Sequence, residues 1–336
     1  MRQITVVLGF LVCGGAFAGN AFAVDPQLMN LVMPDAKVLA GANITSTTSS
    51  PTAQFLITKF GGIQLPAGPL ATLGFNPLQD VTEILAATSA NQSSPDGLIL
   101  ARGTFPVDKI TGLATSGSNP TWQVSTYGGA TLLSMSSKDK VTAVAFPSNS
   151  SPSNSIFIAG SLASVKAAID RSTGANSIDP ALALAVNNLS GTEDEWLVSS
   201  ASVASLIPSP ANTTASATGP LAQILPLLKS IQGFSGGVKF GDPVVLNAEA
   251  VENSAANAGA LTAIIKLGLL MVGGLSSNQS GNQDLAGLVQ ILQNTQVTTN
   301  DSNVNISLSV PEAQIETLLK NVRPAVSGTN QRPSRR

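Results

Sequence analysis

The chain has 336 residues, of which 17 are Lys or Arg and 19 are Asp or Glu, so its formal net charge is −2. Charged residues make up 11 % of the sequence, well below the quarter or so that is usual in soluble domains, and histidine is absent. The absence of histidine excludes catalysis by histidine and metal binding through histidine. The composition also lacks the basic surplus that binding to a nucleic-acid backbone requires.

The N-terminal segment 1–23 has the three parts of a secretory signal peptide. Arg2 supplies a positive charge, Ile4 to Ala18 form an apolar run, and Ala21-Phe22-Ala23 fits the small-residue rule for cleavage, with Ala16-Phe17-Ala18 as an alternative. Cleavage after Ala23 removes Cys13, the single cysteine, so the mature chain has no thiol and forms no disulfide. We therefore expect a periplasmic or extracellular protein.

Helix-start signals and alternating apolar residues predict an α+β fold for the mature chain. Helices are expected at 51–60, 162–171 and 181–189, because each follows a Ser or Asp cap and two of them begin at a proline. The expected strands are 37–44, 81–87, 97–105, 122–136, 141–146, 155–159 and 196–200, the fourth split into a hairpin at Tyr127-Gly128-Gly129. Since strands, hairpins and helices are interleaved, we expect mainly antiparallel sheets with helices packed on one face.

Two distant segments, 98–113 and 303–318, align without gaps and share one pattern. Each has an alternating strand, a proline and then a helix with two apolar residues three positions apart. The matched positions, all expected to be buried, are Ile110 and Leu113 in the first segment and Ile315 and Leu318 in the second. A weaker similarity links 38–60 and 244–267, since each has the pattern of a strand followed by an apolar helix. We therefore predict two related α+β lobes, with chance convergence as the alternative.

The predicted domain organisation follows from this repeat and from composition. It consists of a signal peptide (1–23), a first α+β lobe (24–205), a Pro/Ser/Thr-rich linker (206–220), a second α+β lobe (221–322) and a disordered basic tail (323–336).

Several phrases of the first lobe resemble those of uncharacterised exported proteins of bacteria. They lie within about 28–205 and are LVMPDAKVLAG (31–41), GFNPLQDVTEIL (74–85), LILARG (98–103) and AGSLASVKAAIDR (159–171). The resemblance is one of word pattern and includes no catalytic signature. It implies a bacterial, exported protein and no particular activity.

Two motifs suggest chemistry that their surroundings do not support. Gly233-Phe-Ser235-Gly-Gly237 satisfies G-x-S-x-G, but the serine of that motif needs a base, and here an expected helix precedes and an expected strand follows. Segment 301–312 has oxygen ligands at positions 1, 3, 5 and 12 of a calcium loop, but Ile306 replaces the glycine required at position 6. We expect a glycine-rich turn at 233–237 and an Asx-rich turn at 301–305.

The densest acidic cluster is Glu193-Asp194-Glu195, directly before Trp196. Paired carboxylates serve glycoside hydrolysis, in which one acts as acid and the other as base or nucleophile. Three adjacent acids after Gly191-Thr192 more often form a solvated turn before a strand, which is the interpretation we favour.

The most apolar stretch of the mature chain is 258–275, which reaches the lower length limit of a membrane span. Lys266 would then lie near the bilayer centre, and no positive flank anchors either end. A buried helix of the second lobe is favoured, and a lipid- or partner-facing helix is the alternative.

These observations predict an exported, non-catalytic protein with a binding or structural role in the envelope or outside the cell. Its partner would be an unknown protein or envelope component, and no nucleic acid, cofactor, metal or catalytic residue is predicted. The second hypothesis is a carboxylate-based hydrolase that uses Glu193 or Glu195. The third is a membrane-associated protein that uses the helix at 258–275.

Overall fold

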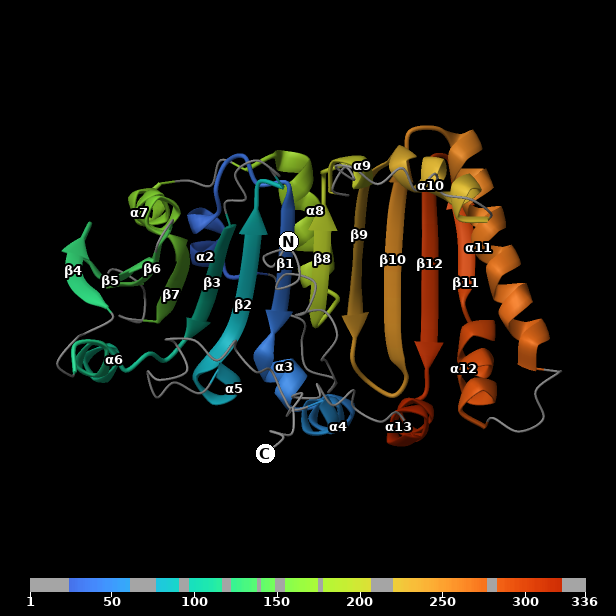
Figure 1. Cartoon of the computed structure of the whole chain (residues 1–336), viewed down its shortest axis with the longest axis horizontal. Coiled ribbons are helices and arrows are strands. Elements are labelled where there is room, and N and C mark those ends of the chain that lie inside the picture. The colour runs from blue at the N-terminus through green and yellow to red at the C-terminus, as the bar shows by residue number, and fades with distance from the viewer. Residues whose placement is uncertain are drawn as a thin grey trace, which may run out of the picture.

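The computed structural model describes residues 24–60, 77–90, 97–116, 122–137, 140–148, 155–174, 178–206, 220–276 and 283–321. The predicted signal peptide, linker residues 207–219 and the basic tail lie outside these ranges. The strands form one 12-stranded antiparallel sheet in the order β11-β12-β10-β9-β8-β1-β2-β3-β7-β6-β5-β4 (Figure 1). The chain therefore has a mixed α+β fold.

The N-terminal half, residues 24–206, contains every strand and capped helix predicted for it. Its strands are β1 (Val38–Asn43), β2 (Val81–Thr88), β3 (Gly97–Gly103), β4 (Gln123–Tyr127), β5 (Ala130–Ser137), β6 (Lys140–Pro147), β7 (Ile156–Ser161) and β8 (Glu195–Ser199). Its helices are α2 (Pro26–Leu31), α3 (Ile44–Thr48), α4 (Pro51–Phe60), α5 (Pro77–Asp80), α6 (Val107–Ala114), α7 (Leu162–Arg171), α8 (Pro180–Ser190) and α9 (Val203–Leu206).

The helix starts agree with the caps in the sequence. The Ser161 hydroxyl accepts a hydrogen bond from Ser164 N at 3.1 Å, which begins α7. The Asp179 carboxylate accepts from Ala181 N at 2.8 Å, and Pro180 takes the first helical position of α8. Each cap satisfies an amide that has no partner within the helix.

The C-terminal half, residues 220–321, extends the same sheet. Its elements are α10 (Pro220–Ser230), β9 (Ile231–Lys239), β10 (Val244–Glu252), α11 (Ala255–Ser276), α12 (Gln283–Gln293), β11 (Gln296–Asn300), β12 (Asn303–Val310) and α13 (Glu312–Asn321). The two halves meet where β8 pairs with β9. A second contact joins α4 and α13, because the Glu312 carboxylate accepts a hydrogen bond from Thr52 N at 2.7 Å (Figure 1).

In the N-terminal half, apolar side chains cover both faces of the sheet. Helices α2, α7 and α8 pack with Leu132 on one face, whereas α6 packs with its neighbour Leu133 on the other. The expectation of helices on one face is therefore wrong for this half. The physical reason lies in strands such as Ala143–Phe146, which are continuously apolar and become stable only when both faces are covered.

The repeated strand-proline-helix pattern is present twice, as β3 with α6 and as β12 with α13. Ile110 is buried as expected, but Leu113 is 41 % exposed, so its expected burial is wrong. The buried face of α6 is formed by Val107, Ile110 and Ala114, and Leu113 falls beside that face. Ile315 is half-buried, and the side chain of Leu318 lies outside the described part.

The repeated segments hold different positions in the sheet. In the N-terminal half β2 lies between β1 and β3, whereas in the C-terminal half β12 pairs directly with β10. The sequence echo therefore reflects a shared local pattern in the two halves, without a shared strand order.

Candidate functional site

Helix α11 extends over Ala255–Ser276, so a helix at the apolar stretch is confirmed, but the favoured burial of this helix is wrong. Its window Ala255–Val272 has a mean hydropathy of 1.7, and only 17 % of that window is buried. By length and composition this helix is able to cross a membrane. The buried residues of that window are Ala258, Leu261 and Thr262, which lie in the N-terminal half of the helix.

The exposed face of α11 consists of large apolar side chains in its C-terminal half. Leu267 is 56 % exposed, Leu270 73 % and Met271 65 %, and the neighbouring Lys266 is also exposed. The N-terminal half is held on the sheet, where the hydroxyls of Thr262 and Thr299 on β11 lie 2.6 Å apart. The C-terminal end of α11 lies outside the edge strand β11 (Figure 1).

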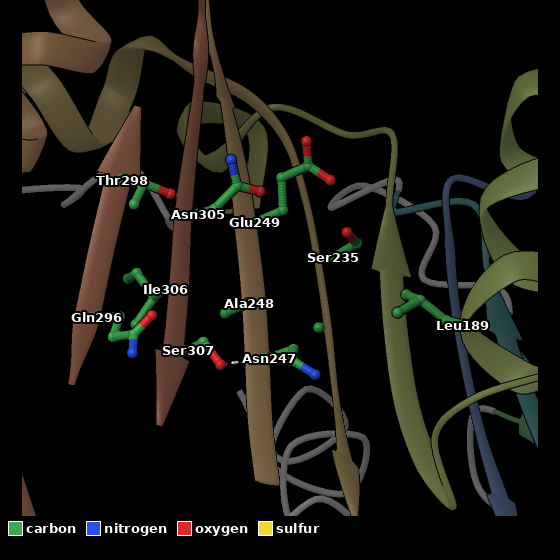
Figure 2. A pocket seen from close by; sticks show the side chains of 11 residues that line it. Leu189, Ser235, Asn247, Ala248, Glu249, Gln296, Thr298, Asn305, Ile306 and Ser307 are labelled. Atoms are coloured by element: carbon green, nitrogen blue, oxygen red, sulfur yellow. Dashed lines mark hydrogen bonds between the residues drawn. The ribbon is translucent and has the colours of Figure 1, made fainter. Parts of the chain in front are cut away.

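A polar hollow of about 290 Å³ lies on the sheet face opposite α11. Along β12, Val304 packs against α11, so the alternating neighbours Asn305 and Ser307 point into the hollow. Figure 2 shows them beside Asn247 and Glu249 of β10. This face was not expected from the sequence, although polar residues alternate at 303, 305 and 307 and at 247 and 249.

Three polar side chains of this lining, Asn247, Glu249 and Ser307, form hydrogen bonds. Asn247 donates from its amide nitrogen to the Glu193 carboxylate at 3.1 Å, and its amide oxygen accepts from the Ser307 hydroxyl at 2.9 Å. The Glu249 carboxylate accepts from the Asn303 side-chain amide at 2.6 Å. The described lining has neither a cation for an anionic ligand nor an aromatic ring on which a sugar or base could stack.

The acidic turn is buried, so the favoured interpretation of a solvated turn is wrong. The exposed fractions of Glu193, Asp194 and Glu195 are 7 %, 1 % and 4 %. Asp194 forms an ion pair with Lys239 Nζ at 2.8 Å and also accepts from Phe240 N at 2.8 Å. Two backbone bonds of Asp194 join this turn to β1 and β9, which encloses the acids between the two halves of the sheet.

Glu193 and Glu195 lie on opposite faces of the sheet. Glu193 accepts a hydrogen bond from Asn247. Asn247 is paired with Gly237 and Gly237 with Trp196, so the side chains of Asn247 and Trp196 point to the same face of the sheet. Glu195 directly precedes Trp196 in β8, so its side chain points to the other face. Glycoside hydrolysis needs two carboxyl groups that face each other across one cleft, and this pair does not have that arrangement.

Glu195 is held in an unfavourable environment for a charge. Burial, and secondarily the negative charge of Asp194, raise the pKa of Glu195 to about 8. Its Oε2 atom is buried without a hydrogen-bond partner. The nearby Thr47 hydroxyl opposes these two effects and lowers the pKa of the carboxyl, although the two side chains do not meet the distance and angle of a hydrogen bond. At neutral pH this side chain is therefore mainly protonated.

The G-x-S-x-G segment lies inside strand β9, so the expected glycine-rich turn is wrong. Ser235 pairs with Val198 on one side and with Glu249 on the other. A Cβ on Gly237 would lie 2.5 Å from Glu193 Cγ, so this glycine makes room for the buried acid. A serine in mid-strand lacks the strand-to-helix turn that exposes the hydrolase nucleophile.

A turn is present at Asp301 and Ser302, but Asn303 and Asn305 of the expected Asx-rich turn lie in strand β12. Asp301 has φ 51°, a left-handed conformation that Asp tolerates, and it links β11 to β12. Residues 303–310, which would have to wrap around a calcium ion, instead form β12. Within the described ranges, no three His, Cys, Asp or Glu side chains are grouped to hold a metal ion.

No family model matches the sequence, and no curated protein matches it. Among solved structures, the chain is similar to TP0453 in its crystal form I, with a TM-score of 0.47 and 10 % sequence identity. That similarity covers 90 % of this chain and 100 % of the TP0453 chain. At this identity no residue role is transferred from TP0453.

Proposed function

We propose that the protein is an exported, non-catalytic protein of the cell envelope that associates with a lipid bilayer through the exposed face of α11. The observation that carries this proposal is the stripe of Leu267, Leu270 and Met271, each more than half exposed. A helix that is apolar all round is stable inside a core or in hydrocarbon, and most of α11 lies outside the core.

The composition of α11 favours lipid over a protein partner. Its 22 residues contain no aromatic side chain, no arginine and no acid, whereas protein interfaces concentrate their binding energy in Trp, Tyr and Arg. Lys266 is its single charge, and the flexible stem of a lysine allows the ammonium group to reach lipid headgroups while the stem stays in apolar surroundings. Because its N-terminal half packs on the sheet, we propose that α11 lies along the membrane surface with its C-terminal half immersed.

The expected affinity is modest. Burial of an exposed Leu or Met side chain contributes about 1.5 to 3 kcal/mol, so the three partly exposed side chains supply on the order of 4 kcal/mol. That free energy corresponds to binding in about the millimolar range of accessible lipid. Association would therefore be reversible and would need a large excess of lipid.

Vesicle flotation of the mature chain tests this proposal. The decisive variant carries Leu267→Gln, Leu270→Gln and Met271→Gln, which keep good helix propensity and remove the apolar stripe. The matched control is Leu184→Gln on α8, where the leucine is 62 % exposed but stands outside the stripe. We expect the wild type and the control to float with the vesicles and the triple variant to stay in solution.

The outcomes separate lipid from other partners. Absence of flotation with both zwitterionic and anionic vesicles would contradict the proposal, as would equal flotation of the triple variant. If the wild type instead forms a dimer that the triple substitution dissociates, a second copy covers the stripe. Sedimentation measured in parallel, without vesicles, distinguishes that case.

We also infer a division into two lobes, 24–205 and 221–322, within the continuous sheet. The apolar clusters support it, since two of them lie in the N-terminal half and the other two lie almost wholly in the C-terminal half. Limited proteolysis should cut between 206 and 220 and leave two fragments that co-purify through the β8–β9 pairing. Cleavage elsewhere at equal rates would contradict this division.

A further inference from the structure

The first residue that the structure describes, Val24, is packed into the N-terminal half. Its side chain is 5 % exposed and belongs to the main apolar cluster with α2, α7 and α8. Its backbone nitrogen donates to the Ser190 hydroxyl, at the end of α8, at 3.2 Å. This burial of Val24 is unusual for a chain that continues to a signal peptide, because the residue that follows the predicted cleavage point is enclosed by protein.

A carboxylate accepts hydrogen bonds from the backbone nitrogen of the following residue, Asp25. Glu83 of β2 accepts hydrogen bonds from Asp25 N with both oxygens, at 3.2 and 3.3 Å. Backbone nitrogens of consecutive residues are at most about 3.6 Å apart, so the Val24 nitrogen lies within about 7 Å of the Glu83 carboxylate. Opposite charges within about 4 to 6 Å of each other favour each other's charged form.

The other charged groups here already have partners. Asp25 pairs with the Arg102 guanidinium, Nη2 to Oδ2 at 2.6 Å, and Arg102 also donates to Ser155 and to the Gln27 side chain. Asp25 and Arg102 are the charged groups that act on Glu83, with opposite signs. Burial raises the pKa of Glu83 to about 7. The negative charge of its carboxylate is therefore only partly balanced by positive charge as long as the nitrogen of residue 24 is an uncharged amide.

We propose that cleavage of the Ala23–Val24 bond creates a buried α-ammonium group at Val24, which pairs with Glu83 and fixes the mature N-terminus in the fold. A peptidase adds water across this bond, leaving a carboxylate on Ala23 and an amine on Val24. The amine binds a proton at neutral pH. One N–H remains directed at Ser190, and the others are available to Glu83. This inference rests on the export part of the proposed function and is independent of α11.

The proposal distinguishes between the two predicted cleavage sites. Cleavage after Ala18 would leave five further residues before Val24, with an uncharged amide beside Glu83. Cleavage after Ala23 places the new charge beside the buried acid. The tertiary contacts therefore favour cleavage after Ala23 as the reaction that produces the stable mature protein.

Three versions of the chain test the proposal: one beginning at Val24, one at Ala23 and one at Gly19, each made with a scarless N-terminus and without other changes. The Ala23 version is the matched control, because it keeps the ammonium but moves it by one residue. At pH 7 we expect the Val24 version to unfold at a temperature higher by on the order of 2 to 5 °C. When the same three versions carry Glu83→Gln, the Val24 version should no longer be the most stable, because its ammonium group has lost its partner charge.

Equal unfolding temperatures of the three wild-type versions would overturn the proposal, and so would a difference that persists with Glu83→Gln. Any loss of stability caused by Glu83→Gln itself cancels, since the comparison is made within that background. N-terminal sequencing of the exported protein reports separately on processing. Vesicle flotation of the Val24 version reports on α11, so failure of the membrane proposal leaves this result interpretable.

Discussion

Replacing the buried acid Glu195 with Gln should stabilise the protein, and more so as the pH rises. The folded-state pKa of Glu195 is about 8, against 4.5 for an exposed glutamate, as in the unfolded chain. The folded state therefore holds a proton that the unfolded state has lost, and stability falls as the pH rises through the window between these two values. A Gln side chain has nearly the same shape and no charge, so it removes this loss.

The size of the effect follows from the two pKa values. The cost of Glu195 is roughly 1 kcal/mol at pH 5 and about 3 kcal/mol at pH 7. Glu195→Gln should therefore exceed the wild type in free energy of unfolding by about 3 kcal/mol at pH 7. The gap should shrink by about 2 kcal/mol on going to pH 5.

Urea denaturation followed by tryptophan fluorescence measures this difference, because Trp196 is buried directly beside the substituted residue. The control is Asp108→Asn, an exposed acid on α6 whose replacement should change the free energy by less than about 1 kcal/mol at either pH. A Glu195→Gln variant that is less stable than the wild type at pH 7, or whose advantage is independent of pH, would refute the reasoning.

Three further substitutions test the packing. Leu100→Ala should cost about 2 to 5 kcal/mol of unfolding free energy, whereas Leu113→Ala should cost less than about 1 kcal/mol, because Leu100 is 0 % and Leu113 41 % exposed. Chemical denaturation measures both, and equal losses would contradict the exposed position of Leu113 on α6. Gly41→Ala should destabilise by roughly 2 kcal/mol or more and shift the tryptophan emission, because the new Cβ would lie 2.3 Å from the Trp196 ring; an unchanged spectrum and stability would contradict that close contact.

Local signals in the sequence determined the secondary structure of this protein to a large extent. The helix at 162–171 has the predicted bounds, because a serine cap and an apolar stripe specify its start and its face within ten residues. The hairpin of β4 and β5 turns at Gly128 and Gly129, which both adopt the positive φ that only glycine takes readily. Such features depend on neighbours in the chain, so the sequence contains all that decides them.

Tertiary structure decided the features that bear on function. The acids at 193–195 resemble a surface turn in sequence, yet they are enclosed because β9, some forty residues later, pairs with β8. The apolar stretch at 258–275 has the composition of a core helix, yet its helix lies at the edge of the sheet, with Leu267, Leu270 and Met271 exposed. The neighbourhood of Val24, Ser190 and Glu83 joins three distant segments. Burial and charge pairing at these sites depend on which segments meet in space, and no local pattern contains that information.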